Sequence, residues 1–342
     1  MVHPVEKMAV ITVGGEIPPE QLGITDIHEH MLCDLTKNYE SIAGVEAEAK
    51  VELATLGIVT NNPSAIKDNL ILDDVDLAIA ELLEFGKAGG RTVVDLTTAE
   101  FGRNPGALRR IAEATGINII TCTGRYVEAY QSSEVKRMSV EALQDEMLRE
   151  IRVGIGESGV RAGVIGEIGT SERLYPEEAK VLVAAARVNA SEGAPIAVHT
   201  NPKSRLAMDI LDLLSSNGAD LSKVALCHLD SDFVEVSYFE DIFNTGANIE
   251  FDTFGENFCL HPNYGPSDLD RVKSLCSLLE RGYLGQIMLG CDVCLKCRLH
   301  AYGGWGYDHI LSNVLPAMKR YGISGEEIET LLVGNPRDFL DF

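Results

Sequence analysis

Eight apolar stretches of strand length recur along the chain, and each is followed by a segment with helical periodicity. Most of the stretches are near-continuous and rich in Val and Ile, which is the pattern of strands buried on both faces of a parallel sheet. Eight β–α units in succession predict an α/β protein with a closed (β/α)8 barrel, the TIM barrel. A doubly wound open sheet is the alternative, but no GxGxxG turn follows the first stretch. The predicted strands are residues 24–30, 91–98, 118–124, 161–170, 195–201, 224–230, 248–255 and 286–292.

The segments between these stretches carry helix start and stop signals. Residues 105–116, for example, begin with Pro and end with Gly, as helices often do. We expect one barrel domain over 1–342, with 1–22 forming a hairpin extension around Gly14 and Gly15, and an insertion over 31–71. Helices are predicted over 72–90, 105–116, 139–154, 175–193, 204–218, 232–246, 267–283, 306–322 and 325–342.

The charge balance excludes several kinds of partner. The 342 residues include 52 acidic and 29 basic side chains, which gives a formal net charge of −23. This leaves no excess of Lys and Arg for binding nucleic acid or an anionic membrane surface. No apolar run is long enough to span a membrane, and the first residues do not form a signal peptide. We therefore expect a cytoplasmic protein.

Polar side chains that can bind metals lie at the ends of five predicted strands. They are His28 and His30 in the first, Glu167 in the fourth, His199 in the fifth, His228 in the sixth and Asp292 in the eighth. The carboxyl ends of barrel strands meet on one face, where the active sites of this fold lie. A single histidine at such a position is commonly just a hydrogen-bonded polar group. Four imidazoles and two carboxylates on one rim are too many for one zinc ion and suit two divalent ions.

This set of side chains predicts hydrolytic chemistry. Two ions that share a water molecule lower its pKa enough to give hydroxide near neutral pH. Glu167 is the candidate carboxylate between the ions, and Asp292 is the candidate catalytic residue that binds one ion and shuttles the proton. Zinc is the expected metal, with manganese and cobalt as alternatives.

At these residues the sequence resembles the phosphotriesterase family of the amidohydrolase superfamily. The resemblance rests on TDIHEH, LGCDVC, YGGWGYDHIL and GNPRDFL and on the order of the strand-end ligands. It implies that His28, His30 and Asp292 hold a more buried ion, that His199 and His228 hold a more exposed one, and that Glu167 bridges both. The best-known members have a carboxylated lysine at the position of Glu167, whereas other members have Glu there.

The resemblance leaves three functions open. The first is hydrolysis of a lactone or carboxylic ester by a metal-bridging hydroxide, with weak phosphotriesterase activity as an addition. The second is hydrolysis of an amide in an N-acylated amino or sulfonic acid, which the VIGEIG segment around Glu167 favours. The third is a barrel that binds a small ligand without turnover.

Members of the family are often homodimers.

Four side chains on the loops after the strands are candidate substrate contacts: Arg103, Arg125, Tyr126 and Lys296. Such loops build the substrate pockets of barrels. A group of cations there would fit a small-molecule substrate with an anionic group, although surface charge is the alternative explanation.

The segment CDVCLKC over 291–297 contains three of the eight cysteines, and His300 follows it closely. A small Cys3His metal site is one interpretation. Free thiols near the barrel mouth are the favoured interpretation.

Overall fold

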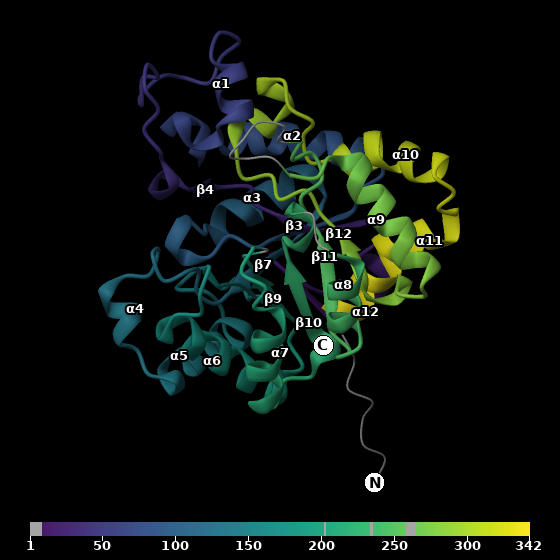
Figure 1. The fold of residues 1–342 in the computed structure, drawn as a ribbon. Helices are drawn as coiled ribbons and strands as arrows, with labels where there is room; N and C mark the ends of the chain where they lie inside the picture. Colours follow the sequence, from purple (N-terminus) through teal and green to yellow (C-terminus); the bar gives the residue numbers. More distant parts are fainter. Residues whose placement is uncertain (1–8, 202, 233–234, 258–264) are drawn as a thin grey trace.

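Eight parallel strands form the centre of the molecule, and helices surround them (Figure 1). The computed structural model describes residues 9–201, 203–232, 235–257 and 265–342. The barrel strands lie within the stretches predicted from the sequence. They are β3 (Thr25–Glu29), β6 (Thr92–Asp95), β7 (Asn118–Thr123), β8 (Val164–Gly169), β9 (Ile196–His199), β10 (Val224–Cys227), β11 (Asn248–Phe251) and β12 (Ile287–Leu289).

The strands follow one another around the barrel in chain order, from β3 through β6 to β12. Neighbouring strands are parallel, and in one such pair Cys227 lies opposite His199. The backbone N–H of Asp292, just past β12, donates to the carbonyl oxygen of His28 at 2.9 Å. This hydrogen bond joins the last strand to the first, so the sheet is a nearly closed barrel. The predicted TIM barrel is confirmed.

Helices connect successive strands on the outside of the barrel. Helix α3 begins at Pro105, and Gly116 follows it with a φ of 71°, as the sequence signals predicted. The larger helices are α2 (Val75–Lys87), α3 (Pro105–Thr115), α5 (Val140–Arg152), α6 (Pro176–Glu192), α7 (Ala207–Ser216), α8 (Val236–Phe243) and α9 (Asp268–Glu280).

The last two predicted helices contain a wider turn. Residues 310–314 and 330–334 are π-helical, and they lead into α10 (Leu315–Arg320) and α12 (Asn335–Leu340). Pro316 and Pro336 follow these turns closely. A proline inside a helix has no N–H to donate and collides with the preceding turn, so the backbone widens there. The short helix α11 (Gly325–Glu329) lies between the two segments.

The apolar side chains of the strands point alternately into and out of the barrel. Val94, Ala225 and Met288 belong to an inner cluster, whereas their chain neighbours belong to a larger cluster under the helices. The N-terminal hairpin, β1 (Val10–Thr12) and β2 (Gly15–Ile17), is present as predicted. Val10 packs in the inner cluster together with Phe339 of α12. The hairpin and α12 therefore close the amino end of the barrel and leave the carboxyl end open.

The segment between β3 and α2 contains little regular structure. It holds the strand pair β4 (Cys33–Asp34) and β5 (Ile71–Leu72) and the helix α1 (Leu56–Asn61). This segment lies at the upper left of Figure 1, apart from α4 (Ser133–Arg137), α5 and α6. Within the described residues, none of the helices has the length and apolar character needed to cross a membrane.

Candidate metal centre

His28 is fully buried at the end of β3. Its Nδ1 atom lies 2.9 Å from Oε2 of Glu250 and 3.2 Å from Oδ2 of Asp252. Its Nε2 atom is buried without a hydrogen-bond partner among the described residues. That atom lies 3.7 Å from Oε1 of Glu167 and 3.9 Å from Oδ1 of Asp292. An orphaned imidazole nitrogen between two carboxylates fits a metal ligand, because a buried polar atom without a partner is otherwise costly.

His30 and Asp292 complete what we call the inner group with His28. The Nε2 atom of His30 lies 3.1 Å from Oδ1 of Asp292. The other ring nitrogen of His30 lies 3.0 Å from the hydroxyl of Thr97. Both histidines of the inner group therefore have Nδ1 engaged by a neighbour and Nε2 turned toward carboxylates, which is how second partners orient metal-binding imidazoles.

His199 and His228, here called the outer pair, contact the same carboxylate oxygen. Oε1 of Glu167 lies 2.7 Å from Nδ1 of His199 and 2.5 Å from Nε2 of His228. The Nδ1 atom of His228 lies 3.1 Å from Oδ1 of Asp252, so this acid contacts a histidine of each set. The side chain of His199 is 24% exposed, whereas that of His28 is fully buried. The outer pair is therefore the side of the centre that a substrate can reach.

Glu167 belongs to both halves of the centre. It forms one compact ligand group with His28 and His30 and a second with His199 and His228. A carboxylate with two oxygens can serve two ions in this position. The donor set of imidazoles and carboxylates fits two divalent ions. The structure thus brings the six predicted side chains together, and their roles as ligands stay a prediction.

The electrostatics of the centre match this donor set. Burial alone would raise the pKa of Glu167, but the nearby His199 and His228 hold it well below its usual range. Burial alone would lower the pKa of His28, but its hydrogen bond and charge interaction with Asp252 raise it well above the usual value. Carboxylates and imidazoles this close stabilise each other's charged forms. A divalent ion can replace the protons that the imidazoles would otherwise carry.

The backbone is unusual at two of these residues. His228 and Asp292 have φ angles of 63° and 49°, and Arg205 is the third non-glycine residue with positive φ in the described chain. This region is unfavourable for residues with a Cβ atom, and such conformations cluster at functional sites. Gly290 lies nearby, where a Cβ atom would sit 2.9 Å from Cβ of His28. The β12 backbone can therefore approach β3 only because residue 290 is a glycine.

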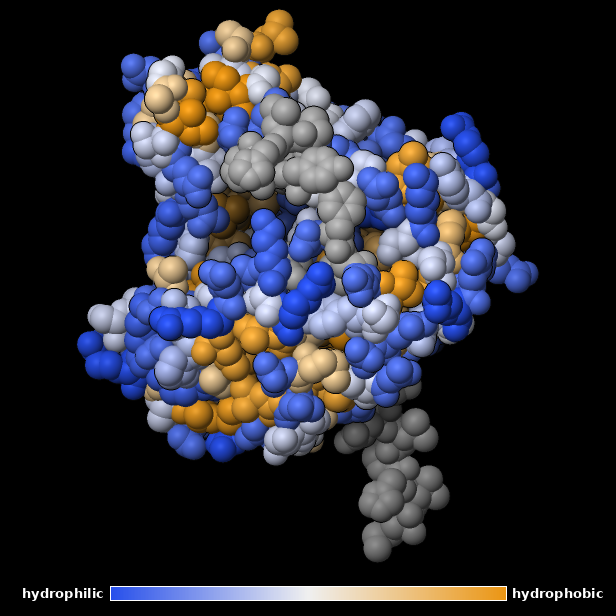
Figure 2. Space-filling view, viewed as in Figure 1, coloured by the Kyte–Doolittle hydropathy of each residue, from blue (hydrophilic) through white to orange (hydrophobic). Residues whose placement is uncertain are grey.

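A cavity of about 530 Å³ opens above the outer pair. Its wall includes His199, His228 and Asp292 and neutral polar side chains such as Asn38 and Tyr126. The Tyr126 hydroxyl lies 3.4 Å from Nδ1 of His199, so this predicted substrate contact reaches the centre. Figure 2 shows a hollow in the surface between the segment that carries α1 and the body below it.

The three predicted cationic contacts have other partners. Arg103 makes two hydrogen bonds to the carboxylate of Glu150, at 2.8 and 2.9 Å. Arg125 pairs with Glu100 and Glu146, and Lys296 pairs with Asp68 at 2.9 Å. None of the three is among the residues that line the cavity within the described chain. Their role in substrate binding stays a prediction, and the structure gives it no support.

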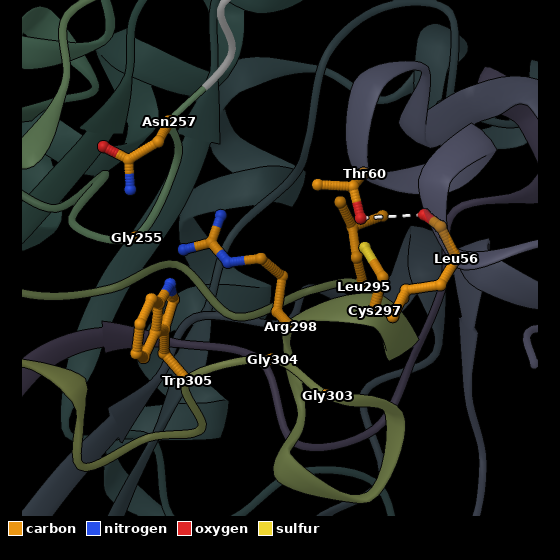
Figure 3. Close-up of a pocket in the computed structure, with 10 residues that line it drawn as sticks. All are labelled: Leu56, Thr60, Gly255, Asn257, Leu295, Cys297, Arg298, Gly303, Gly304 and Trp305. Carbon is orange, nitrogen blue, oxygen red and sulfur yellow. Dashed lines mark hydrogen bonds between the residues drawn. The ribbon is translucent and has the colours of Figure 1, made fainter. Parts of the chain in front are cut away.

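Figure 3 shows the residues around a second, smaller cavity of about 140 Å³. Arg298 and Trp305 line it together with Leu56 of α1. The Arg298 guanidinium donates to the carbonyl oxygen of Phe254 at 2.7 Å and lies 3.4 Å from Glu256, which lines the larger cavity. The charge of Arg298 is therefore balanced at the boundary between the two cavities.

Among the described residues, no group of potential metal ligands combines the cysteines of CDVCLKC with His300. All seven cysteines described there are free, and Cys259 lies outside them. The two ring nitrogens of His300 lie 3.0 Å from Glu81 and 3.2 Å from Asp308. The Cys3His interpretation is therefore not supported.

Two acids that support the histidines were not predicted from the sequence. Glu250 and Asp252 lie two residues apart in the segment NIEFD, and both side chains are fully buried. Two acids at this spacing in a strand point to the same face. Buried carboxylates need a partner. This spacing in an otherwise apolar strand was the signal that could have identified them.

Comparison with known proteins identifies the family. The model of the phosphotriesterase family matches residues 8–340. The chain belongs to the phosphotriesterase family. An N-acetyltaurine hydrolase from Danio rerio is 36% identical over 341 residues, which cover 97% of this chain and 98% of the relative.

Two solved structures are also similar. A resiniferatoxin-binding protein from Rhodobacter sphaeroides has 36% identity and a TM-score of 0.94, with 97% of this chain and 94% of that chain covered. A phosphotriesterase homology protein from Escherichia coli, complexed with phosphate in its active site, has 32% identity and a TM-score of 0.79, with 94% and 99% covered. Together with the ligand groups around Glu167, these relatives identify the chain as a metal-dependent hydrolase of the phosphotriesterase kind.

Proposed function

We propose that this hydrolase cleaves the amide bond of an N-acylated aminosulfonic acid of the N-acetyltaurine type, to give a carboxylate and the free amine. The supporting observation is the 36% identity to an N-acetyltaurine hydrolase over 97% of the chain. This is the second of the three functions considered from the sequence. The first, lactone or ester hydrolysis, has no comparable support among the relatives described above, so the amide is the preferred substrate.

We assign distinct roles to the residues of the centre. His28, His30 and Asp292 would hold one divalent ion, His199 and His228 would hold the other, and Glu167 would contact both. When bound, such ions polarise the amide carbonyl and make a water molecule a stronger nucleophile at neutral pH. The open side of the centre is the outer pair, where the cavity meets the side chain of His199.

Asp292 is the residue that we assign to proton transfer. An amine is a poor leaving group until its nitrogen is protonated, so amide hydrolysis needs an acid at that point. Asp292 lines the cavity, and its Oδ1 atom lies 3.1 Å from Nε2 of His30, which fixes its orientation. It can take a proton from the attacking water and return it to the departing nitrogen.

Tyr126 is the residue that we assign to substrate orientation. Its hydroxyl lies beside His199 at the cavity wall. Its pKa is raised well above the usual value, mainly by burial and also by the charge of Glu167. The hydroxyl therefore stays protonated and can donate a hydrogen bond to the carbonyl oxygen of the substrate.

A substrate screen tests the proposal. Protein purified and assayed with zinc or manganese would be given N-acetyltaurine, N-acetylglycine, a γ-lactone, a carboxylic ester and a phosphotriester, each at several concentrations. We expect the highest kcat/KM for N-acetyltaurine, measured as taurine release. The variant His199→Ala should lose this activity, whereas His300→Gln, which alters an imidazole outside the centre, should keep it. A higher kcat/KM for the lactone or the ester would overturn the amide assignment.

A further inference from the structure

We propose that Lys203 recognises the anionic end of the substrate and sets the preference for a sulfonate. This inference rests on the proposed amide hydrolysis and adds a specificity-determining residue to it. An N-acylated aminosulfonic acid carries its negative charge two carbons from the scissile amide, so the site needs a cation at that distance from the reacting carbonyl. The candidates are the basic side chains around the cavity.

One basic side chain lies on the cavity wall within the described residues. The described residues that line this cavity include Lys203 as the only Lys or Arg. Arg103, Arg125 and Lys296 are held by carboxylates elsewhere, as is Arg298 at the boundary with the second cavity.

The nearby basic residues outside the wall are also engaged. The Lys37 ammonium donates to the carbonyl oxygen of Tyr130 at 3.0 Å and lies over its ring. The Arg205 guanidinium lies over the ring of Tyr238. By contrast, the Lys203 ammonium has no hydrogen bond or ion pair within the described residues, which leaves its charge available to a ligand.

The loop that carries Lys203 is anchored next to the metal centre. It begins at His199, the last residue of β9, and continues through Asn201. The side-chain oxygen of Asn201 accepts from the Lys203 backbone N–H at 3.1 Å, and its carbonyl oxygen accepts from the Ser204 hydroxyl at 2.7 Å. These bonds hold the backbone of Lys203 four residues from a predicted ligand, while its exposed side chain reaches along the cavity wall.

The acidic residues around the cavity explain why an anionic substrate would need a cation there. Glu172, Glu256 and Asp292 also line the cavity, and the whole chain has a net charge of −23. An anionic substrate would be repelled by such a wall unless a positive group met its charged end. Lys203 supplies this group on the cavity wall, to which the partly exposed His199 also belongs. Its compact ammonium with three donors suits the three oxygens of a sulfonate.

The test compares two substrates that differ only at the end that Lys203 would contact. N-acetyltaurine carries a sulfonate, and N-(2-hydroxyethyl)acetamide carries a neutral hydroxyl in its place. In Lys203→Ala we expect KM for N-acetyltaurine to rise by about tenfold, the lower range for a hydrogen bond to a charged group, because the lysine is exposed. The kcat for N-acetyltaurine and the kcat/KM for the neutral analogue should stay unchanged. Lys203→Arg should restore most of the affinity.

The matched control is Lys319→Ala, which removes the same charge from an exposed lysine on α10, outside the cavities described here. It should leave both substrates unaffected. A second readout is independent of turnover: calorimetric binding of ethanesulfonate to the metal-loaded protein, which should weaken in Lys203→Ala and not in Lys319→Ala.

The outcomes separate this inference from the proposed function. If the parent protein hydrolyses N-acetyltaurine and Lys203→Ala has the same KM, the role of Lys203 is overturned and the amide hydrolysis stands. If ethanesulfonate binding depends on Lys203 but N-acetyltaurine is not hydrolysed, the anion site stands and the proposed reaction is wrong. An equal rise in KM for the neutral analogue would mean that Lys203 shapes the loop and does not bind the sulfonate.

Discussion

The two halves of the candidate metal centre differ in how deeply their histidines are buried and in which side chains hold them. In the inner group, His28 is fully buried and held by Glu250 and Asp252, and His30 is held by Thr97. In the outer pair, His199 is partly exposed, and its neighbours at the ring are Glu167 and the Tyr126 hydroxyl. His28 and His30 are therefore each held by a buried side chain at Nδ1, whereas the partly exposed His199 borders the cavity that a substrate would enter. This difference predicts that mutations on the two sides will fail in different ways.

Removing the carboxylate that both halves share should have the largest effect. Glu167→Ala is expected to lower kcat/KM by at least about a thousandfold, because two bound ions would contribute several kcal/mol of transition-state stabilisation and Glu167 is the predicted ligand of both. Metal analysis of the purified variant should show fewer than two ions per chain. The conservative Glu167→Asp, as control, should keep part of the metal content. Two tightly bound ions in Glu167→Ala would contradict the shared role.

Metal stoichiometry should then distinguish the halves. His199→Ala removes a ligand from the exposed side only, so we expect one ion per chain and no turnover. His28→Ala breaks the buried side, leaves Glu250 without its imidazole and leaves Asp252 with His228 alone, so it should bind less than one ion and be less stable. Atomic emission and thermal unfolding measure both quantities. Equal metal content in the two variants would refute the distinction.

Substitution of the residues that hold the histidines should further separate the two halves of the centre. Asp252 contacts one histidine of each half, and Thr97 contacts His30 alone. Asp252→Asn is expected to weaken the affinity for both ions by about 10- to 100-fold, as is usual for a residue that orients metal ligands. Thr97→Val should weaken only one. Chelator titration monitored by residual metal would reveal two shifted steps in the first variant and one in the second.

On the accessible side, loss of a single hydroxyl should produce a small kinetic effect. Tyr126→Phe keeps the ring beside His199 and removes one hydrogen bond to the substrate. We expect a three- to tenfold change in kcat/KM, corresponding to about 1 kcal/mol, with two ions still bound. A loss of metal in this variant would show that the tyrosine supports the ligands instead of the substrate.

A substitution outside both halves, at Asp68, should change the stability of the protein and leave the metal centre unaffected. Burial alone would raise the pKa of Asp68, but hydrogen bonds from Lys50, the Val51 N–H and Lys296 lower it to about 2. Because this pKa is depressed in the folded state, the stabilisation is present above the usual Asp pKa of 3.8 and is lost as pH falls through about 2. Asp68→Asn should therefore lower the free energy of unfolding at pH 7 by about 1–2 kcal/mol. Urea denaturation at pH 7 and pH 2.5 should show the difference shrinking in acid, with metal content and KM unchanged at pH 7.

The barrel and the six-residue centre could be predicted from the sequence because both depend on local order along the chain. The end of an apolar run predicts the end of a buried strand, and β9 ends at His199 as this pattern indicated. The topology of eight consecutive units then places such ends on one face. The π-helical turns before Pro316 and Pro336 were missed because both segments read as uninterrupted amphipathic helices.

The substrate residues could not be predicted in the same way, because the partner of a charged side chain is set by the tertiary fold. Arg103 meets an acid 47 positions away, and Lys296 meets one 228 positions away. No periodic pattern encodes such a pairing. Lys203 had no distinguishing sequence signal, and its significance came only from the wall that it lines and from the partners of the other cations.

The hydrogen bond from the Asp292 N–H to the His28 carbonyl oxygen has a consequence for how the protein is made. It joins the beginning of the barrel to its end, and the same two residues belong to the inner group. A nascent chain therefore carries two of the six predicted ligands, His28 and His30, from the start, but a fragment that ends before residue 292 lacks Asp292. The site is complete only after residue 292 has left the ribosome and the last barrel strand has paired with the first. Bringing together residues so far apart in the chain costs loop-closure entropy, so this pairing forms late. The enzyme thus cannot act on its substrate before most of its 342 residues have been translated.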